Sequence, residues 1–257
     1  MKYVTALKGT SFALVVFSLI IVLVPSLNER FSFKGVELML TVSTFLFAII
    51  SGFYISRLAN RYDSVRTFVA EEDALFLAVF KISQHVSKGF SKKISDFIDI
   101  YYIRSYDFTL SEPAYKFSAA PFLDIWDATI QAKKLNQVAY DAMLDRLTGI
   151  EVKRNSAAAV ASERLSGGEW LALISLAMII VTSIIFLKGN DVFSIVSSIL
   201  LMTVISLVLL LIRDLQNFML GGSSLLEESG QEVFEFIGKP RYYQNRFVKN
   251  GMATIPD

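Results

Sequence analysis

The sequence predicts an all-α membrane protein, with four transmembrane helices in two hairpins and a helical cytoplasmic domain between the hairpins. Apolar residues make up 53% of the 257 residues, and the mean hydropathy is +0.49. Soluble domains usually have about 45–50% apolar residues. Four apolar runs approach the ~20 residues that a helix needs to cross a bilayer. Charged residues still make up 19% of the chain, so part of it is expected to lie in water.

The four apolar runs occur in two pairs. They are Gly9–Leu27, a run that starts at Val36, Glu169–Leu187 and Val192–Ile212. The connections within the pairs, residues 28–35 and 188–191, are short enough to favour antiparallel hairpins. The first run ends without a small-x-small cleavage site, so we expect a retained span and not a signal peptide.

These runs divide the chain into four parts. We expect residues 1–56 to form the first transmembrane hairpin and residues 57–168 to form a helical cytoplasmic domain. Residues 169–212 would form the second hairpin, and residues 213–257 a cytoplasmic C-terminal segment. The hairpin loops contain only three of the 25 lysines and arginines. The positive-inside rule therefore predicts that both termini lie in the cytoplasm.

Helical spacing continues beyond the second run. Apolar residues recur at helical intervals from Val65 to Ile82, so the second helix is expected to continue or restart in the cytoplasmic domain. Further on we predict an amphipathic helix over residues 91–106, a loop over 108–121 bounded by prolines, a long helix from Phe122 through Ile150, and a short helix over 224–236.

The sequence contains no motif for nucleic-acid binding, metal binding or enzymatic catalysis. The net charge of +1 gives no reason to expect nucleic acid as a partner. The absence of cysteine excludes thiolate metal sites, and we expect the only histidine, His85, to be structural or on the surface. There is no glycine-rich phosphate loop, and acidic pairs such as Asp96 with Asp99 have no nucleophile beside them. We therefore expect neither enzymatic activity nor a cofactor.

The second apolar run contains a stripe of residues spaced four apart. Phe45, Ile49 and Phe53 should stack along one side of the helix. The same spacing reaches four flanking residues, which are Thr41 and Glu37 at one end and Arg57 and Arg61 at the other. We interpret the first three as a pore neck and the other four as pore mouths. Lipid-facing or interhelical packing of the neck, and anchoring of the arginines at the membrane surface, are the simpler readings.

A cluster of acids, Glu71, Glu72 and Asp73, follows on the same predicted helix. Acidic clusters are usually solvated helix faces. In a symmetric oligomer the cluster could instead form a ring that attracts cations, and both readings remain open at this point.

The run from Phe45 to Tyr54, FLFAIISGFY, resembles the neck helix of bestrophin channels. In that helix two bulky apolar residues and the Phe of a GFY sequence line the constriction, and an arginine two turns later is followed by an aromatic residue, as in Arg61-Tyr62. The order of spans and domain also agrees. The whole chain is similar to the bestrophin-like family of bacterial membrane proteins. Its Arg213-Asp214-Leu215 sequence resembles the segment that follows the last span in that family. Asp214 is not followed here by the dense acidic calcium clasp of animal bestrophins, so calcium gating is not carried over.

The resemblance implies a homopentamer in the bacterial inner membrane, with the second helix of each subunit around the axis. We therefore expect an oligomeric ion channel with a hydrophobic neck. Its partners would be inorganic ions, the lipid bilayer and other copies of the chain. Inner arginines give a slight preference for anions, which Glu37 opposes. The alternative is a non-conducting membrane anchor with a helical docking or signalling domain.

Overall fold

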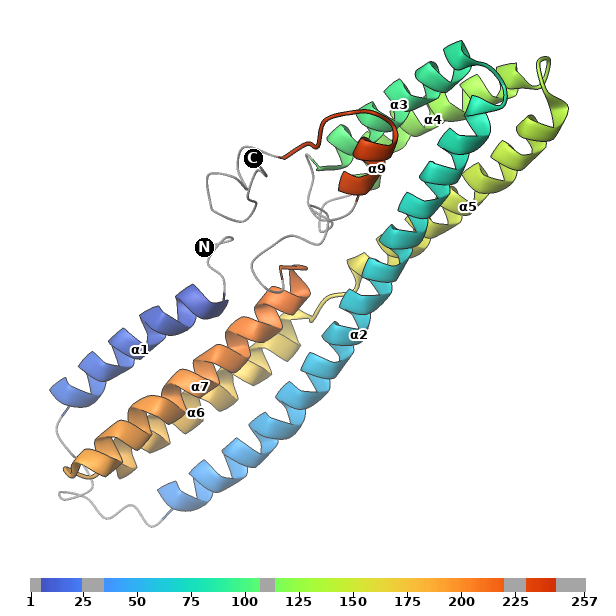
Figure 1. The fold of residues 1–257 in the computed structure, drawn as a ribbon. Helices are drawn as coiled ribbons and strands as arrows, with labels where there is room; N and C mark the ends of the chain where they lie inside the picture. The colour runs from blue at the N-terminus through green and yellow to red at the C-terminus, as the bar shows by residue number, and fades with distance from the viewer. Residues whose placement is uncertain (1–5, 25–34, 107–113, 220–229, 244–257) are drawn as a thin grey trace. The chain divides into compact units, whose positions relative to one another are not determined.

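The computed structural model describes residues 6–24, 35–106, 114–219 and 230–243, and every regular element within these ranges is a helix (Figure 1). This confirms the all-α fold class. The chain divides into two compact units. The first comprises Met1–Asn60 with Arg164–Gly222, and the second comprises Arg61–Glu163 with Ser223–Asp257.

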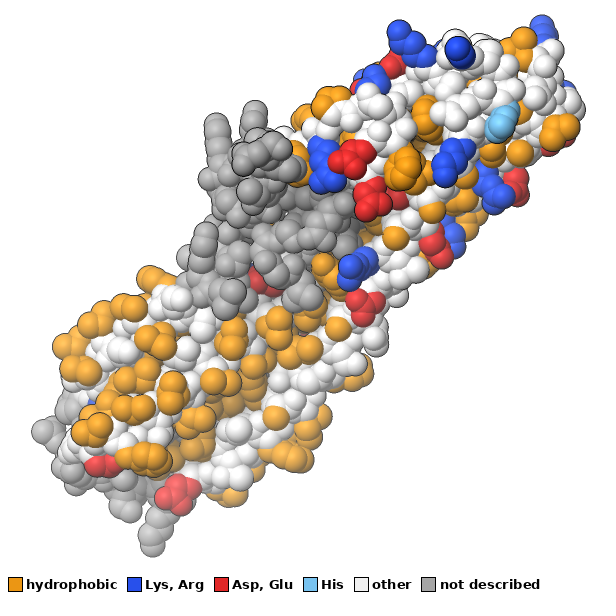
Figure 2. Space-filling model, viewed as in Figure 1, with side chains coloured by type: hydrophobic (Ala, Val, Ile, Leu, Met, Phe, Trp, Pro, Cys, Tyr) orange, Lys and Arg blue, Asp and Glu red, His pale blue; other side chains and the backbone are white. Residues whose placement is uncertain are grey.

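The first unit contains the apolar helices. These are α1 (Ala6–Leu23), the first half of α2 (Val36–Gln84), α6 (Gly167–Leu187) and α7 (Val192–Gln216). Helix α1 packs along α7, and α6 packs beside α7 (Figure 1). Ser166 caps α6 in a capping box with Glu169, so the helix starts where its backbone donors are satisfied. Hydrophobic side chains are spread over the face of this unit seen in Figure 2, with few charged side chains among them.

Three of these helices are long and apolar enough to cross a membrane: α2, α6 and α7. The apolar stretch of α1, Gly9–Leu23, is shorter than the other three. At 1.5 Å per residue, a helix of this length covers about 22 Å of a ~30 Å hydrocarbon core. The fourth span therefore stays a prediction, and most of the loop expected in the first hairpin lies outside the described residues.

The second unit has a core of its own. The second half of α2 packs with α3 (Lys88–Tyr106), α4 (Ala114–Ala132), α5 (Gln137–Ser162) and α9 (Gln231–Phe236). The centre of the core is built from side chains with less than 2% exposure, among them Phe76, Ile94, Ile98, Tyr101, Met143, Leu147 and Phe234. Their spacing on each helix gives the amphipathic pattern that the sequence analysis used.

Helix α2 runs without interruption from Val36 to Gln84. The sequence analysis allowed this helix either to continue or to restart after the apolar run, and it continues. No proline interrupts it, and Gly52 is its only glycine. The boundary between the two compact units falls within this helix, between Asn60 and Arg61.

Two predictions for the second unit were wrong. Pro121 lies inside α4 and not at the end of a loop, because that helix already begins at Ala114. A proline within a helix removes one backbone hydrogen bond, and here both Pro121 and the neighbouring Phe122 are buried. The predicted helix from Phe122 through Ile150 is two helices, because Asn136 caps a new one by accepting a 3.0 Å hydrogen bond from Ala139 N.

One helix start also differs from the prediction, and another can be compared only in part. Helix α3 begins at Lys88, before Gly89, with Ser87 accepting a hydrogen bond of 3.1 Å from Phe90 N. The C-terminal helix is described from Gln231 onward, and residues 224–229 of its predicted range lie outside the described residues.

Candidate neck helix

The predicted neck residues lie on the exposed side of α2. Phe45, Ile49 and Phe53 are 65%, 55% and 63% exposed in the isolated chain. The opposite side of the helix is buried and consists of Ser43, Phe47, Ser51 and Leu58. Because α-helical residues are 100° apart, these four lie about 120–200° around the axis from Ile49. The stripe therefore points away from the other described helices of the first unit.

Helix geometry also places the predicted neck residues and the predicted mouth residues at different angles around the axis of α2. Positions four apart advance by about 40°, so Phe45 and Phe53 lie within about 80° of each other. Glu37 and Arg57 are about 200° apart, although they are separated by about 30 Å along the axis, close to the thickness of the hydrocarbon core. A straight α2 can present the three neck residues to one axis, while Glu37 and Arg57 flank that face on opposite sides.

The outer end of the stripe has simple local contacts. Glu37 and Thr41 are both exposed, and the Thr41 hydroxyl donates a hydrogen bond of 2.9 Å to the Glu37 carbonyl. Glu37 lies in the first turn of α2, where a negative charge interacts favourably with the helix dipole.

At the other end, Arg57 is held by an ion pair. Its Nη1 lies 3.1 Å from Oε1 of Glu169, the same carboxylate that closes the capping box of α6. The Arg57 side chain is 40% exposed. This pair joins α2 to the start of α6 and partly neutralises the arginine that was predicted to attract anions.

Arg61 differs from the other stripe residues, because it is only 5% exposed. Its Nε donates to the Val160 carbonyl at 3.1 Å and its Nη2 donates to the Ala161 carbonyl at 2.6 Å. These carbonyls belong to the last turn of α5, where backbone acceptors have no partner within the helix and a positive charge is favoured. We therefore interpret Arg61 as a C-terminal cap of α5.

A largely apolar groove of about 550 Å³ lies between α2, α6 and α7. Its α2 wall includes Thr44, Ala48 and Gly52, one residue along the chain before each neck residue. Sequence reasoning did not find this groove, although the small residues at intervals of four are typical of a helix surface that another helix can approach closely.

The acidic cluster on α2 is engaged in the second unit. Glu72 is 4% exposed and accepts a hydrogen bond from the Tyr101 hydroxyl. Asp73 accepts from Tyr102, and Glu71 forms an ion pair of 2.7 Å with Lys153. The sequence predicted either a solvated helix face or a cation-attracting ring. Neither prediction includes these contacts, in which each of the three acids has a partner within the second unit. Among the described residues, no group of three or more His, Asp or Glu side chains could hold a metal ion.

The sequence matches the bestrophin-like domain over residues 9–221, which is most of its length. The chain belongs to the bestrophin-like family. The resemblance of the whole chain to this family is thereby confirmed, and this bestrophin-like protein is a membrane protein. Searches of curated proteins and of solved structures found no match.

In this bestrophin-like chain, the last turn of α7 and the residues that follow it make several short contacts. Arg213 and Asp214 form an ion pair of 2.7 Å, and the Asp214 carbonyl accepts from Met219 N at 3.0 Å. Phe218 adopts a positive φ of 55° and is buried. Gln216 accepts a hydrogen bond of 3.1 Å from the indole of Trp170, a contact that the sequence did not reveal because its two residues lie 46 positions apart in the chain.

Proposed function

We propose that the protein is a homo-oligomeric ion channel in which Phe45, Ile49 and Phe53 of each subunit form a hydrophobic neck around a shared axis. The observation that carries the proposal is the orientation of α2. Its bulky apolar stripe is exposed while the opposite face is buried against its own subunit. Membership of the bestrophin-like family supports the same reading.

A ring of phenyl and aliphatic side chains can stop ions without closing mechanically. Apolar constrictions expel water, and an ion cannot enter a dry segment without losing its hydration. The three neck residues cover about 12 Å of helix, enough for a dewetted barrier. The channel would open when the neck widens and refills with water.

We further propose a pentamer in the bacterial inner membrane, with both termini in the cytoplasm and a slight preference for anions. The family resemblance supports the number of subunits, and the distribution of lysine and arginine supports the orientation. The anion preference now depends on Arg57 alone, because Arg61 is bonded to the end of α5.

The direct test widens the neck. Phe53→Ala and Ile49→Ala are introduced separately, and chloride flux is measured in liposomes. We expect both variants to conduct more than the wild type, because each removes apolar bulk from the ring. Leu200→Ala is the matched control, since Leu200 is an exposed apolar residue of α7 outside the stripe. Equal flux in all four proteins would remove the neck from the mechanism.

The second candidate is a non-conducting membrane anchor. It is favoured by the separate core of the second unit, which could act as a docking module without a pore. The two functions differ in assembly, because a single chain cannot enclose an axis with one α2. A monomer in mild detergent, measured by native mass spectrometry, would favour the anchor.

A further inference from the structure

The second unit contains a pocket of about 500 Å³ that the proposed pore does not use. It lies where the end of α2 and the start of α3 meet the residue that follows α9. Its lining consists of Phe80, Gln84, Lys88, Ser91, Lys92, Ser95 and Ile237. This volume is within the ~300–1,000 Å³ range of small-molecule sites. Two cations and several neutral polar groups line it, and none of its described lining residues is acidic.

The two lysines are separated by one helical turn and present their charges to the same pocket. Lys88 and Lys92 are exposed, and neither forms an ion pair with any residue that the structure describes. Other lysines of this unit are engaged, such as Lys153 with Glu71 and Lys239 with Asp96. The positive charge at this pocket is therefore available to a ligand.

Two serines of α3 add hydroxyl groups to the lining of the pocket. Ser91 is 8% exposed and its hydroxyl makes no hydrogen bond within the described part of the chain. Ser95 is 6% exposed and donates to the Ile237 carbonyl at 3.1 Å. The Ser91 hydroxyl is not among the fully buried polar atoms that lack a partner, so it is open to the pocket that Ser91 lines, where a ligand could accept its hydrogen bond.

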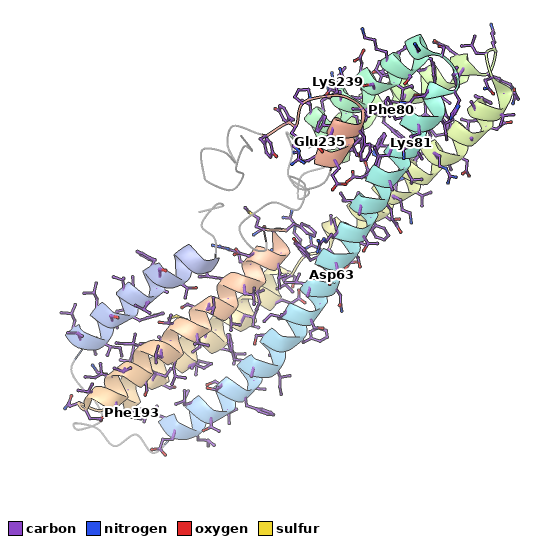
Figure 3. The ribbon with its side chains drawn as sticks, viewed as in Figure 1. Asp63, Phe80, Lys81, Phe193, Glu235 and Lys239 are labelled. Carbon is purple, nitrogen blue, oxygen red and sulfur yellow. The ribbon has the colours of Figure 1, made fainter. Side chains whose placement is uncertain are left out.

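The side of the pocket formed by the residue after α9 is held in place by ion pairs. Lys239 Nζ lies 2.7 Å from Asp96 and 3.5 Å from Asp99, which fixes the segment after α9 against α3. The hydrogen bond to Asp96 raises the pKa of Lys239, so its ammonium stays charged. Figure 3 shows Phe80 and Lys239 beside α9. These contacts also occupy two acids of α3 that would otherwise oppose an anion.

We propose that this pocket binds a phosphate-bearing anion, with Lys88 and Lys92 contributing charge and Ser91 donating a hydrogen bond. Phosphate carries nearly two negative charges and several acceptor oxygens, which suits two ammonium groups and a hydroxyl in one pocket. The apolar side chains of Phe80 and Ile237 offer contact to the organic part of such a ligand. The ligand could be a soluble phosphate compound or a lipid headgroup.

The test uses the full chain in phosphatidylcholine nanodiscs and titrates inorganic pyrophosphate by calorimetry. We expect saturable binding, with Kd about tenfold or more higher in the double variant Lys88→Gln/Lys92→Gln. Ser91→Ala should raise Kd about two- to tenfold. Lys93→Gln is the matched control, because Lys93 has the same charge on the same helix but does not line the pocket. Lys88→Arg/Lys92→Arg should retain binding.

A second arm separates the two sources of phosphate. In nanodiscs that contain phosphatidic acid, a headgroup that occupies the pocket would raise the apparent Kd of pyrophosphate for the wild type. An unchanged Kd would assign the pocket to a soluble compound. Absence of pyrophosphate binding, or equal weakening by Lys93→Gln and by the double variant with melting curves unchanged, would overturn the proposal.

Discussion

The Tyr102 hydroxyl on α3 donates a hydrogen bond of 2.6 Å to Oδ1 of Asp73 on α2. The other oxygen of the same carboxylate accepts a hydrogen bond of 2.9 Å from Gly230 N, at the start of α9. One acidic side chain thus joins three segments of the second unit. The acids that were predicted to form a solvated helix face or a cation-attracting ring have partners within this unit.

Replacing Asp73 should destabilise the second unit. Asp73→Ala leaves the Tyr102 hydroxyl and the Gly230 N–H without their acceptor, at a cost of about 2 kcal/mol or more in the free energy of unfolding. Urea unfolding of the full chain can be followed by Trp126 fluorescence in a Trp170→Phe background. Asp63→Ala is the control, because Asp63 is exposed on the same helix (Figure 3). Equal unfolding midpoints for the two variants would refute the role of Asp73.

Alkaline pH should weaken the same unit through Tyr102. Burial, reinforced by Asp73 and Glu72, raises the pKa of Tyr102 well above its ordinary value of 10.0. A raised pKa means that the neutral form stabilises the folded state fully below about pH 10, and that this stability is lost as the pH rises through the folded-state pKa. In Tyr102→Phe the unfolding midpoint should fall less steeply above pH 10 than in the wild type, as measured by the same Trp126 signal.

Lys188 should hold α1 against the rest of the first unit. It is 5% exposed, and its ammonium donates hydrogen bonds to the Ile21 and Val24 carbonyls at the end of α1. A cation at a helix C-terminus satisfies carbonyls that lack intrahelical partners. We expect Lys188→Met to loosen α1, while Lys188→Arg keeps the contact.

The loosening can be measured at Ile21, which is 1% exposed. An Ile21→Cys thiol, the only one in this cysteine-free chain, should react slowly with a maleimide in the otherwise native protein. We expect several-fold faster labelling when Lys188→Met is added. Equal rates with methionine and lysine at position 188 would show that the ammonium does not fix α1.

The ion pair between Arg57 and Glu169 should tune selectivity if the pore forms. Glu169→Gln releases the arginine from its partner and should raise the ratio of chloride to potassium permeability. Arg57→Gln should lower the ratio, since it removes the only inner-mouth cation left on the exposed stripe. Reversal potentials in planar bilayers measure both effects. Identical ratios of chloride to potassium permeability in the two variants would show that Arg57 does not influence selectivity.

The sequence was sufficient where a pattern is local. The periodicity of α2 located the stripe, and the length of the apolar runs identified α2, α6 and α7 as candidate spans. It failed where tertiary packing decides. Arg61 follows the stripe in spacing, but its partners lie about 100 residues away at the end of α5. The Asn136 cap was readable from the sequence, because Asn is a strong helix N-cap.

The orientation of the stripe in the assembled protein is tested most directly by cross-linking single cysteines between subunits. Phe53→Cys, Phe47→Cys and Leu200→Cys are each made in the cysteine-free chain and treated in liposomes with a short bis-maleimide. Phe47 is buried within its own subunit, and Leu200 is an exposed apolar residue of α7. If Phe53 faces a shared axis, its variant forms covalent dimers and the other two do not. A Phe53→Cys protein that stays monomeric on a denaturing gel, or cross-links no better than Leu200→Cys, would contradict the neck.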